Sequence, residues 1–209
     1  MNDLALNIYK VGELQTNCYI VSKNNECLIF DAGDSADFIL EKLLLAKLTP
    51  IAIFSTHGHF DHVLAVGEIQ LSFDIPFYIS NKDLFLLKRA KKTAEYYLKH
   101  EQVLIPSKNI KDLKDGKLKI NSFEFEVIRT PGHTPGSTCF KFDDFVLTGD
   151  TLFKGTVGRY DFSYSDKNFL KDSINRLFKL SEDTIVYPGH EDETSIGKEM
   201  RNELFSLIF

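Results

Sequence analysis

The chain has 209 residues, of which 43% are hydrophobic and 26% are charged, and its formal net charge is −5. This length suits one domain with a substantial core, and the composition excludes an intrinsically disordered chain. An acidic chain without a lysine- and arginine-rich stretch also argues against a nucleic-acid partner, because gripping a phosphate backbone requires clustered cations. We therefore expect a single folded domain over residues 1–209.

The cysteines and the N-terminus indicate a compartment. Cys18, Cys27 and Cys139 are odd in number and form no CxxC pair, which favours reduced thiols in the cytosol over a disulfide framework. Residues 1–4 lack the basic and apolar regions of a signal peptide. No apolar run approaches the roughly 20 residues that span a bilayer. We expect a cytoplasmic protein without a membrane partner.

The first half of the chain alternates strand and helix patterns. Pro50 ends the first helical pattern, because proline cannot continue a helix. The predicted strands cover residues 6–11, 18–21, 27–31, 51–55 and 76–79. The predicted helices cover residues 38–48, 61–73 and 82–99.

The second half repeats this style, and the two halves meet near residues 101–115. Two hairpins are predicted, 118–120 with 123–129 and 138–142 with 145–148. A helix over 167–180, a strand over 184–187 and a final helix over 195–209 follow. We expect the apolar end of that helix, residues 204–209, to pack on its own domain rather than on a partner. The segment 153–165, which follows Asp150, is the longest without clear structure and is expected to be functional.

The first chemical motif is Thr56-His57-Gly58-His59-Phe60-Asp61-His62, directly after the apolar run 51–55. His57 and His59 are two residues apart, so in an extended backbone they point to the same side. Gly58 between them allows a tight bend. Asp61 and His62 are offset from the first pair. One short turn can therefore offer two ligands to one metal ion and two to a neighbouring ion.

Three further motifs place a metal-competent side chain beside a glycine at a predicted strand end. They occupy residues 130–136, 148–151 and 187–191 and contain His133, Asp150 and His190. Imidazole and carboxylate ligands suit zinc, and also iron or manganese, and a set without thiolate argues against a structural zinc site. His100 ends a predicted helix and is given no chemical role. The candidate metal ligands are His57, His59, Asp61, His62, His133, Asp150 and His190.

At these residues the sequence resembles the metallo-β-lactamase superfamily and, within it, the glyoxalase II-like hydrolases. The resemblance covers almost the whole chain, from the strand at 16–21 and the Asp31-Ala32-Gly33 turn to Pro188-Gly189-His190. It implies an α+β fold, an αββα sandwich in which two mixed β-sheets pack face to face with helices on both outer faces.

The resemblance also implies an allotment of ligands to two divalent ions per chain, zinc in the first place and iron or manganese as alternatives. Asp61 and Asp150 would be the catalytic carboxylates, and Asp150 would bridge both ions. Asp31 resembles a carboxylate that orients the metal loop from behind; its alternative role is that of a turn residue after a strand. One ion would bind His57, His59 and His133, and the other would bind Asp61, His62 and His190.

Two departures from the family pattern bear on the substrate. Full glyoxalase II enzymes continue after the last histidine with a helical domain that helps to bind glutathione, whereas 19 residues follow His190 here. We therefore expect no such domain. Zinc β-lactamases commonly carry a cysteine where this chain has Asp150, which disfavours β-lactam hydrolysis. Arg159 matches a basic position near the glutathione moiety, and its alternative role is to pin its loop by a salt bridge; Lys154 and Tyr160 are further candidates for substrate binding.

The function implied is hydrolysis of S-lactoylglutathione or a related hydroxyacyl thioester through a metal-bridging hydroxide. The expected partner is this small-molecule thioester, and a monomer and a homodimer are both open. One alternative is a mononuclear iron persulfide dioxygenase that uses His57, His133 and Asp150. A lactonase of the same fold and a non-enzymatic protein with a vestigial metal site are the others.

Overall fold

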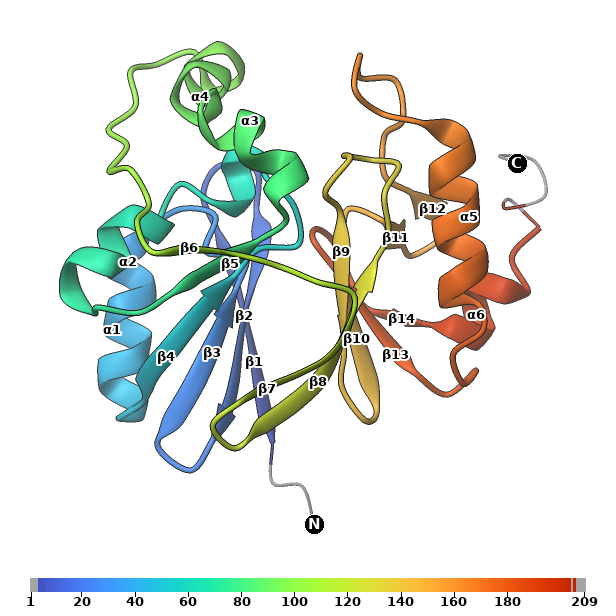
Figure 1. Ribbon diagram of the computed structural model, residues 1–209, viewed down its shortest axis with the longest axis horizontal. Coiled ribbons are helices and arrows are strands. Elements are labelled where there is room, and N and C mark those ends of the chain that lie inside the picture. Colours follow the sequence, from blue (N-terminus) through green and yellow to red (C-terminus); the bar gives the residue numbers. More distant parts are fainter. Residues whose placement is uncertain (1–3, 204, 206–209) are drawn as a thin grey trace. The chain divides into compact units, whose positions relative to one another are not determined.

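The computed structural model describes residues 4–203 and 205, and its chain divides into two compact units, Met1–Leu113 and Lys114–Phe209. The boundary falls within the region where the two sequence halves were expected to meet. Each unit contains a six-stranded mixed sheet and its own helices (Figure 1). The single domain expected over residues 1–209 stays a prediction.

The sheet of the first unit has the order β1-β2-β3-β4-β5-β6. Its first three strands pair antiparallel, and the pairs from β3 to β6 are parallel. β2 lies between two strands and is buried on both faces, as its apolar sequence indicates. The bounds are Ala5–Val11 for β1, Thr16–Lys23 for β2, Glu26–Phe30 for β3, Thr49–Phe54 for β4, Phe77–Ile79 for β5 and Ile110–Asp112 for β6.

The parallel pairs need crossover connections, and helices provide them. α1 (Ala36–Ala46) connects β3 to β4, and α2 (Val66–Ser72) connects β4 to β5. The connection from β5 to β6 holds the short 3₁₀ turn η2 (Asn81–Asp83), α3 (Leu84–Leu87) and α4 (Ala90–Leu98). Because parallel strands share an edge at their carboxyl ends, the segments after β3, β4 and β5 all emerge together. A ladder of stacked rings, Phe30 on Phe54 on Tyr78, marks that edge.

Two predicted helices differ from the structure. The helix predicted over 61–73 is a 3₁₀ turn, η1 (Phe60–His62), followed by α2, because the backbone between them bonds elsewhere. The Leu64 amide is shared between the carbonyl oxygens of Phe60 at 3.0 Å and Gly33 at 3.1 Å, and the Ala65 amide donates to the Ala32 carbonyl oxygen at 3.1 Å. The helix predicted over 82–99 is broken before α4, where the Arg89 amide donates three residues back in a tightened turn.

The sheet of the second unit has the order β14-β13-β10-β9-β8-β7. Both predicted hairpins are confirmed, and Asn121 turns the first with a left-handed φ of 49°. α5 (Lys167–Leu177) belongs to the chain connection from β10 to β13, which pair in parallel. The bounds are Gly116–Ile120 for β7, Phe123–Arg129 for β8, Thr138–Lys141 for β9, Phe145–Gly149 for β10, Ile185–Pro188 for β13 and Thr194–Ser195 for β14.

The remaining elements of this unit are short. The segment 153–165 was expected to lack structure, but its start belongs to a small hairpin of β11 (Leu152–Phe153) and β12 (Thr156–Val157). The final helix is α6 (Ile196–Met200), shorter than predicted. Phe205 is buried and contacts Phe178, while the predicted helical positions 204 and 206–209 lie outside the described residues.

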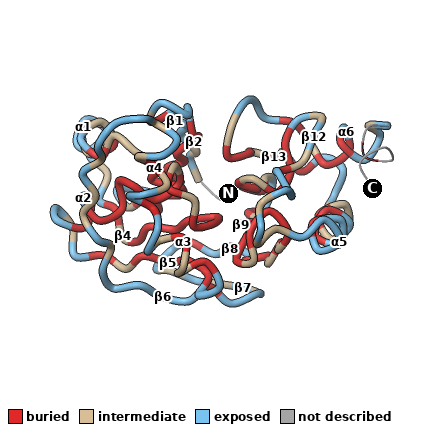
Figure 2. The backbone as a smooth tube through the Cα atoms, turned by 90° about the horizontal axis from the view of Figure 1, so that it is seen from above, coloured by how far each residue is buried: buried red, intermediate tan, exposed pale blue. Residues whose placement is uncertain are grey.

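Each unit has its own apolar core. One buried cluster includes Ile29, Ile53 and Phe77 of the first sheet, and another includes Ile128, Val146 and Val186 of the second. The edge strand β6 is exposed along its length, as its pale blue colour in Figure 2 shows. None of the helices in the described part of the chain combines the length and the apolar character that crossing a bilayer requires.

Candidate metal centre

The first unit carries a group of imidazoles directly after β4. His57 Nε2 lies 3.0 Å from His59 Nδ1, and the ring centroids of His57 and His62 are 4.2 Å apart. η1 brings Asp61 and His62 to the same place, with Asp61 Oδ2 at 3.6 Å from His62 Nε2. Three imidazoles and one carboxylate therefore converge within a segment of six residues, 57–62.

The buried carboxylate of Asp31 accepts two hydrogen bonds from Thr56, the residue that precedes this segment. Its Oδ1 accepts the Thr56 amide at 2.7 Å, and its Oδ2 accepts the Thr56 hydroxyl at 2.9 Å. Because that hydroxyl donates to Asp31, it can only accept from His57 Nδ1, which lies 3.1 Å away. This assigns the proton of His57 to Nδ1 and leaves the lone pair of Nε2 for a metal. Asp31 Oδ2 also lies 3.1 Å from His62 Nδ1.

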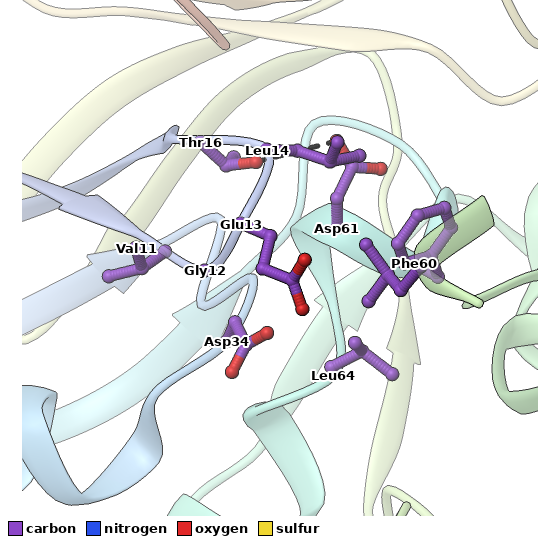
Figure 3. A pocket seen from close by; sticks show the side chains of 10 residues that line it. Val11, Gly12, Glu13, Leu14, Thr16, Asp34, Phe60, Asp61 and Leu64 are labelled. Carbon is purple, nitrogen blue, oxygen red and sulfur yellow. Dashed lines mark hydrogen bonds between the residues drawn. The ribbon is translucent and has the colours of Figure 1, made fainter. Parts of the chain in front are cut away.

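Two hydroxyl groups act on the other end of the same segment. The Ser55 hydroxyl donates to the His62 carbonyl oxygen at 3.2 Å. Figure 3 shows Thr16 and Asp61 joined by a dashed line, which is the hydrogen bond from Thr16 Oγ1 to Asp61 Oδ2 at 3.4 Å. A residue of β2 therefore contacts the Asp61 carboxylate, although Asp61 lies in the turn after β4.

The second unit brings its three candidate ligands together from three strand ends. β10 and β13 are parallel neighbours, so the residues that follow them, Asp150 and His190, emerge side by side. His190 Nε2 lies 3.8 Å from Asp150 Oδ1, and His133 Nε2 lies 3.6 Å from Asp150 Oδ2. The carboxylate of Asp150 thus has one imidazole near each of its oxygens.

Backbone contacts fix the orientation of His133. Its Nδ1 lies 2.8 Å from the Arg159 carbonyl oxygen, which can only accept, so Nδ1 is the donor and Nε2 faces Asp150. The Ser165 hydroxyl donates to the His133 carbonyl oxygen at 2.7 Å. The backbone at Gly158 packs directly against Asp150 and His133. Only glycine fits there, because a Cβ would stand 1.8 Å from the Asp150 carbonyl oxygen and 3.2 Å from His133 Cγ.

The three candidates for substrate binding are exposed side chains of the second unit. The guanidinium group of Arg159 forms two hydrogen bonds with Asp161, both at 2.9 Å. This salt bridge corresponds to the alternative role of Arg159, which is to pin its loop. Lys154 Nζ lies 3.8 Å from Asp192 Oδ2, and the Tyr160 side chain is 37% exposed.

The donor atoms fit metal ions in type and in spacing. They are imidazole nitrogens and carboxylate oxygens, which zinc, iron and manganese bind. Two ligand atoms that bind one tetrahedral zinc at about 2.0–2.1 Å lie about 3.4 Å apart. The distances within each unit, from 3.0 Å to 3.8 Å, bracket that value. The metal-competent side chains are His57, His59, Asp61 and His62 in the first unit and His133, Asp150 and His190 in the second.

The three cysteines and His100 lie outside the ligand motifs. All three cysteines are buried and outside any disulfide. Burial raises the pKa of the Cys27 thiol to about 12, and burial also raises the pKa of Cys18, so both stay protonated and are poor ligands or nucleophiles. His100 Nε2 lies 2.6 Å from Glu13 Oε1, and this hydrogen bond raises the pKa of the exposed imidazole.

Several residues that hold these segments had no signal in the sequence. Ser55 and Ser165 act through hydroxyl bonds to carbonyl oxygens, and Asp83 accepts the Gly58 amide at 2.9 Å. A polar side chain that binds backbone from a distant segment leaves no motif, so only the fold identifies it.

Comparisons with known proteins show the family of this chain. A family model described as the metallo-beta-lactamase superfamily matches residues 11–190. The hydroxyacylglutathione hydrolase GloC of Haemophilus influenzae is 32% identical, over 97% of this chain and 98% of the relative. The crystal structure of BLEG-1 B3 metallo-beta-lactamase has a TM-score of 0.88 and 33% identity and covers 97% of this chain and 100% of its own.

A second solved structure bears on the metal. TTHA1623 in a di-iron-bound form has a TM-score of 0.86 and 35% identity, over 94% of this chain and 98% of its own. Together these likenesses confirm the α+β fold class predicted from the sequence.

Proposed function

The chain belongs to the metallo-β-lactamase superfamily of metal-binding hydrolases, and we propose that it is a binuclear thioesterase of the glyoxalase II type. Its substrate would be S-lactoylglutathione or a related hydroxyacyl thioester. The observation that carries this proposal is the full-length match to GloC, in which the relative has no additional domain to account for the activity in its name.

The proposed centre uses all seven candidate ligands with the allotment that the family resemblance implies. Zinc is proposed first, and iron is supported by the di-iron form of TTHA1623. One ion would bind His57, His59 and His133, the other would bind Asp61, His62 and His190, and Asp150 would serve both.

The chemistry requires a nucleophile and a stabilised oxyanion. Bound divalent ions would lower the pKa of a coordinated water from about 15.7 to about 7 and withdraw electrons from the thioester carbonyl. Asp61 would orient the attacking water and accept its proton, and the hydrogen bond from Thr16 keeps the Asp61 carboxylate turned for that task. The leaving thiolate needs no strong acid, because a thiol has a pKa of about 8.5.

The substrate contacts are proposed at Arg159, with Lys154 and Tyr160 beside it in the chain. The Arg159 carbonyl oxygen contacts His133, so the backbone of Arg159 lies against a proposed ligand. A carboxylate of the thiol carrier would have to bind the Arg159 guanidinium group together with Asp161 or in its place.

The test is hydrolysis of S-lactoylglutathione by the full chain loaded with two zinc ions. We expect kcat/KM above roughly 10⁴ M⁻¹s⁻¹, lost in Asp150→Ala. Asp144→Ala, an exposed carboxylate in the turn between β9 and β10, is the matched control and should keep the activity. A rate near background in the loaded wild-type chain would reject glutathione thioesters as substrates.

Two assays separate the competing activities. A chromogenic β-lactam is tested because BLEG-1 carries the name of a β-lactamase. Oxygen uptake by the iron-loaded chain with glutathione persulfide tests the alternative of a mononuclear dioxygenase that uses His57, His133 and Asp150. Turnover in either assay, without thioesterase activity, would replace the proposal. A small-molecule partner and a monomeric or homodimeric state belong to the same proposal.

A further inference from the structure

The buried carboxylate of Asp83 contacts the middle of the histidine turn. Its Oδ2 accepts the Gly58 amide at 2.9 Å, and Asp83 is 0% exposed. Gly58 is the residue between His57 and His59, so the amide that Asp83 accepts belongs to the peptide link that joins the two histidines. Asp83 lies 25 residues further along the chain, in η2.

Close packing reinforces this hydrogen bond. A Cβ at Gly58 would stand 2.9 Å from the Asp83 carbonyl oxygen, 3.0 Å from Asp83 Cβ and 3.0 Å from Leu86 Cβ. The backbone of the histidine turn therefore lies against η2 and α3 with no room for a side chain. This contact explains the glycine, which has no left-handed φ here.

η2 is itself a well-held turn. The Ser80 hydroxyl accepts the Lys82 amide at 3.4 Å, and the Asp83 amide donates to the Ser80 carbonyl oxygen at 2.9 Å. Asp112 Oδ1 in β6 accepts the Asn81 amide at 2.9 Å from the exposed side. Because β3, β4 and β5 are parallel, Asp31, the histidine turn and η2 all follow carboxyl ends at one sheet edge.

We propose that Asp83 is a positioning residue of the metal centre. It fixes the Gly58 peptide and through it the directions of His57 and His59, while Asp31 fixes the neighbouring Thr56 peptide. Two buried carboxylates, from the loops after β3 and β5 on either side of the loop after β4, thus hold consecutive parts of one ligand segment. This inference rests on the proposed metal centre and adds a residue to it that has no place in the ligand motifs.

The test measures metal binding rather than turnover. Co²⁺ is titrated into the metal-free full chain against a competing chelator, and its visible spectrum reports the ligand geometry. Supporting residues of this kind change metal affinity by about 10–100-fold. We expect Asp83→Ala to weaken Co²⁺ binding by that amount and to alter the spectrum. Asp83→Asn keeps an acceptor oxygen for the Gly58 amide and should retain the wild-type spectrum and most of the affinity.

Asp112→Ala is the matched control, because it removes a carboxylate-to-amide bond from the same turn without touching Gly58. It should leave the spectrum and the affinity unchanged. Gly58→Ala is the second variant, to be used if Asp83→Ala does not fold. Its added Cβ meets the Asp83 carbonyl oxygen, moves the peptide while the carboxylate stays, and should change the spectrum in the same way.

The outcomes separate the two proposals. Wild-type affinity and spectrum in Asp83→Ala would overturn the role of Asp83 and leave the metal centre standing. An equal loss in Asp112→Ala would show a general effect of η2 and would also overturn it. A wild-type chain that binds no Co²⁺ would overturn the metal centre, and the role of Asp83 with it.

Discussion

Asp161 occupies the guanidinium fork of Arg159, accepting hydrogen bonds from Nε and Nη2 at 2.9 Å each. The guanidinium group also lies over the Phe162 ring, 4.4 Å from its centroid. The hydrogen bonds from Arg159 hold the pKa of Asp161 below its ordinary value. The cation proposed to meet the thiol carrier therefore already has a carboxylate partner within the chain.

Replacing Asp161 should strengthen the binding of thioesters whose thiol carrier is anionic. We expect Asp161→Asn to lower KM for S-lactoylglutathione about two- to fivefold, since exposed ion pairs are weak. The value of kcat should stay unchanged, because the carrier binds equally in the ground and transition states. Steady-state kinetics measure both, and a lactoyl thioester of a carrier without carboxylates is the control. The same change in KM for both substrates would contradict a role of Arg159 in carrier binding.

Replacing Asp31 should destabilise the metal-free chain. Asp31→Ala leaves the buried Thr56 amide without its acceptor, which costs about 1–3 kcal/mol. Asp31 also has a left-handed φ of 53°, which asparagine tolerates better than alanine does. Asp31→Asn should therefore lose clearly less free energy of unfolding in a urea titration. Equal losses in the two variants would show that neither the acceptor nor the backbone conformation matters.

Asp150 should control the number of bound metals. Asp150→Ala removes the carboxylate proposed to serve both ions, so we expect the metal content to fall from two ions per chain to one or fewer. Elemental analysis after dialysis measures it, with Asp144→Ala as the control. Two tightly held ions in Asp150→Ala would reject the bridging assignment.

The ion pair of Asp115 and Arg176 should make stability depend on pH. Both oxygens of Asp115 accept from Arg176 at 2.7 Å, and these bonds lower the pKa of the carboxyl. A lowered folded-state pKa stabilises the fold above the ordinary pKa, and that contribution disappears as pH falls through the folded-state pKa. Asp115→Asn should therefore lose stability at pH 7 and much less at pH 3.

The size of this effect is limited by exposure. Both side chains are 41% exposed, so water screens the pair and we expect a loss of about 0.5–1 kcal/mol. Urea midpoints at the two pH values measure the difference, and added salt at pH 7 should shrink it. A loss of equal size at both pH values would assign the effect to packing instead.

Much of the fold follows from sequence patterns, and the exceptions have physical causes. The hairpins at Asn121 and at Asp143 were predictable because turn residues separate alternating apolar runs. β6 was missed, since an exposed strand of three residues has no apolar pattern and exists only through its pairing with β5. The helix expected from Asp61 begins later because the Ala65 amide donates to Ala32 and the Leu64 amide is shared with Gly33.

The candidate site shows the same division. The candidate ligands stand in short motifs that the sequence alone displays, and the structure brings them together within each unit. The supporting contacts depend on pairs that are distant in sequence, such as Gly58 with Asp83. No spacing rule contains such a pair, because the parallel sheet order creates it.

The outermost strands also bear on solubility. β6 and β7 each form one edge of a sheet, where an unpaired strand can add a strand of another chain and start aggregation. β6 is only three residues long and carries Lys111 and Asp112, and β7 carries Lys117 and Lys119 on its exposed positions. Desolvating these charges opposes strand addition. These charges protect the β6 and β7 edges from edge-to-edge association; β1 and β14 form the opposite edges of the two sheets.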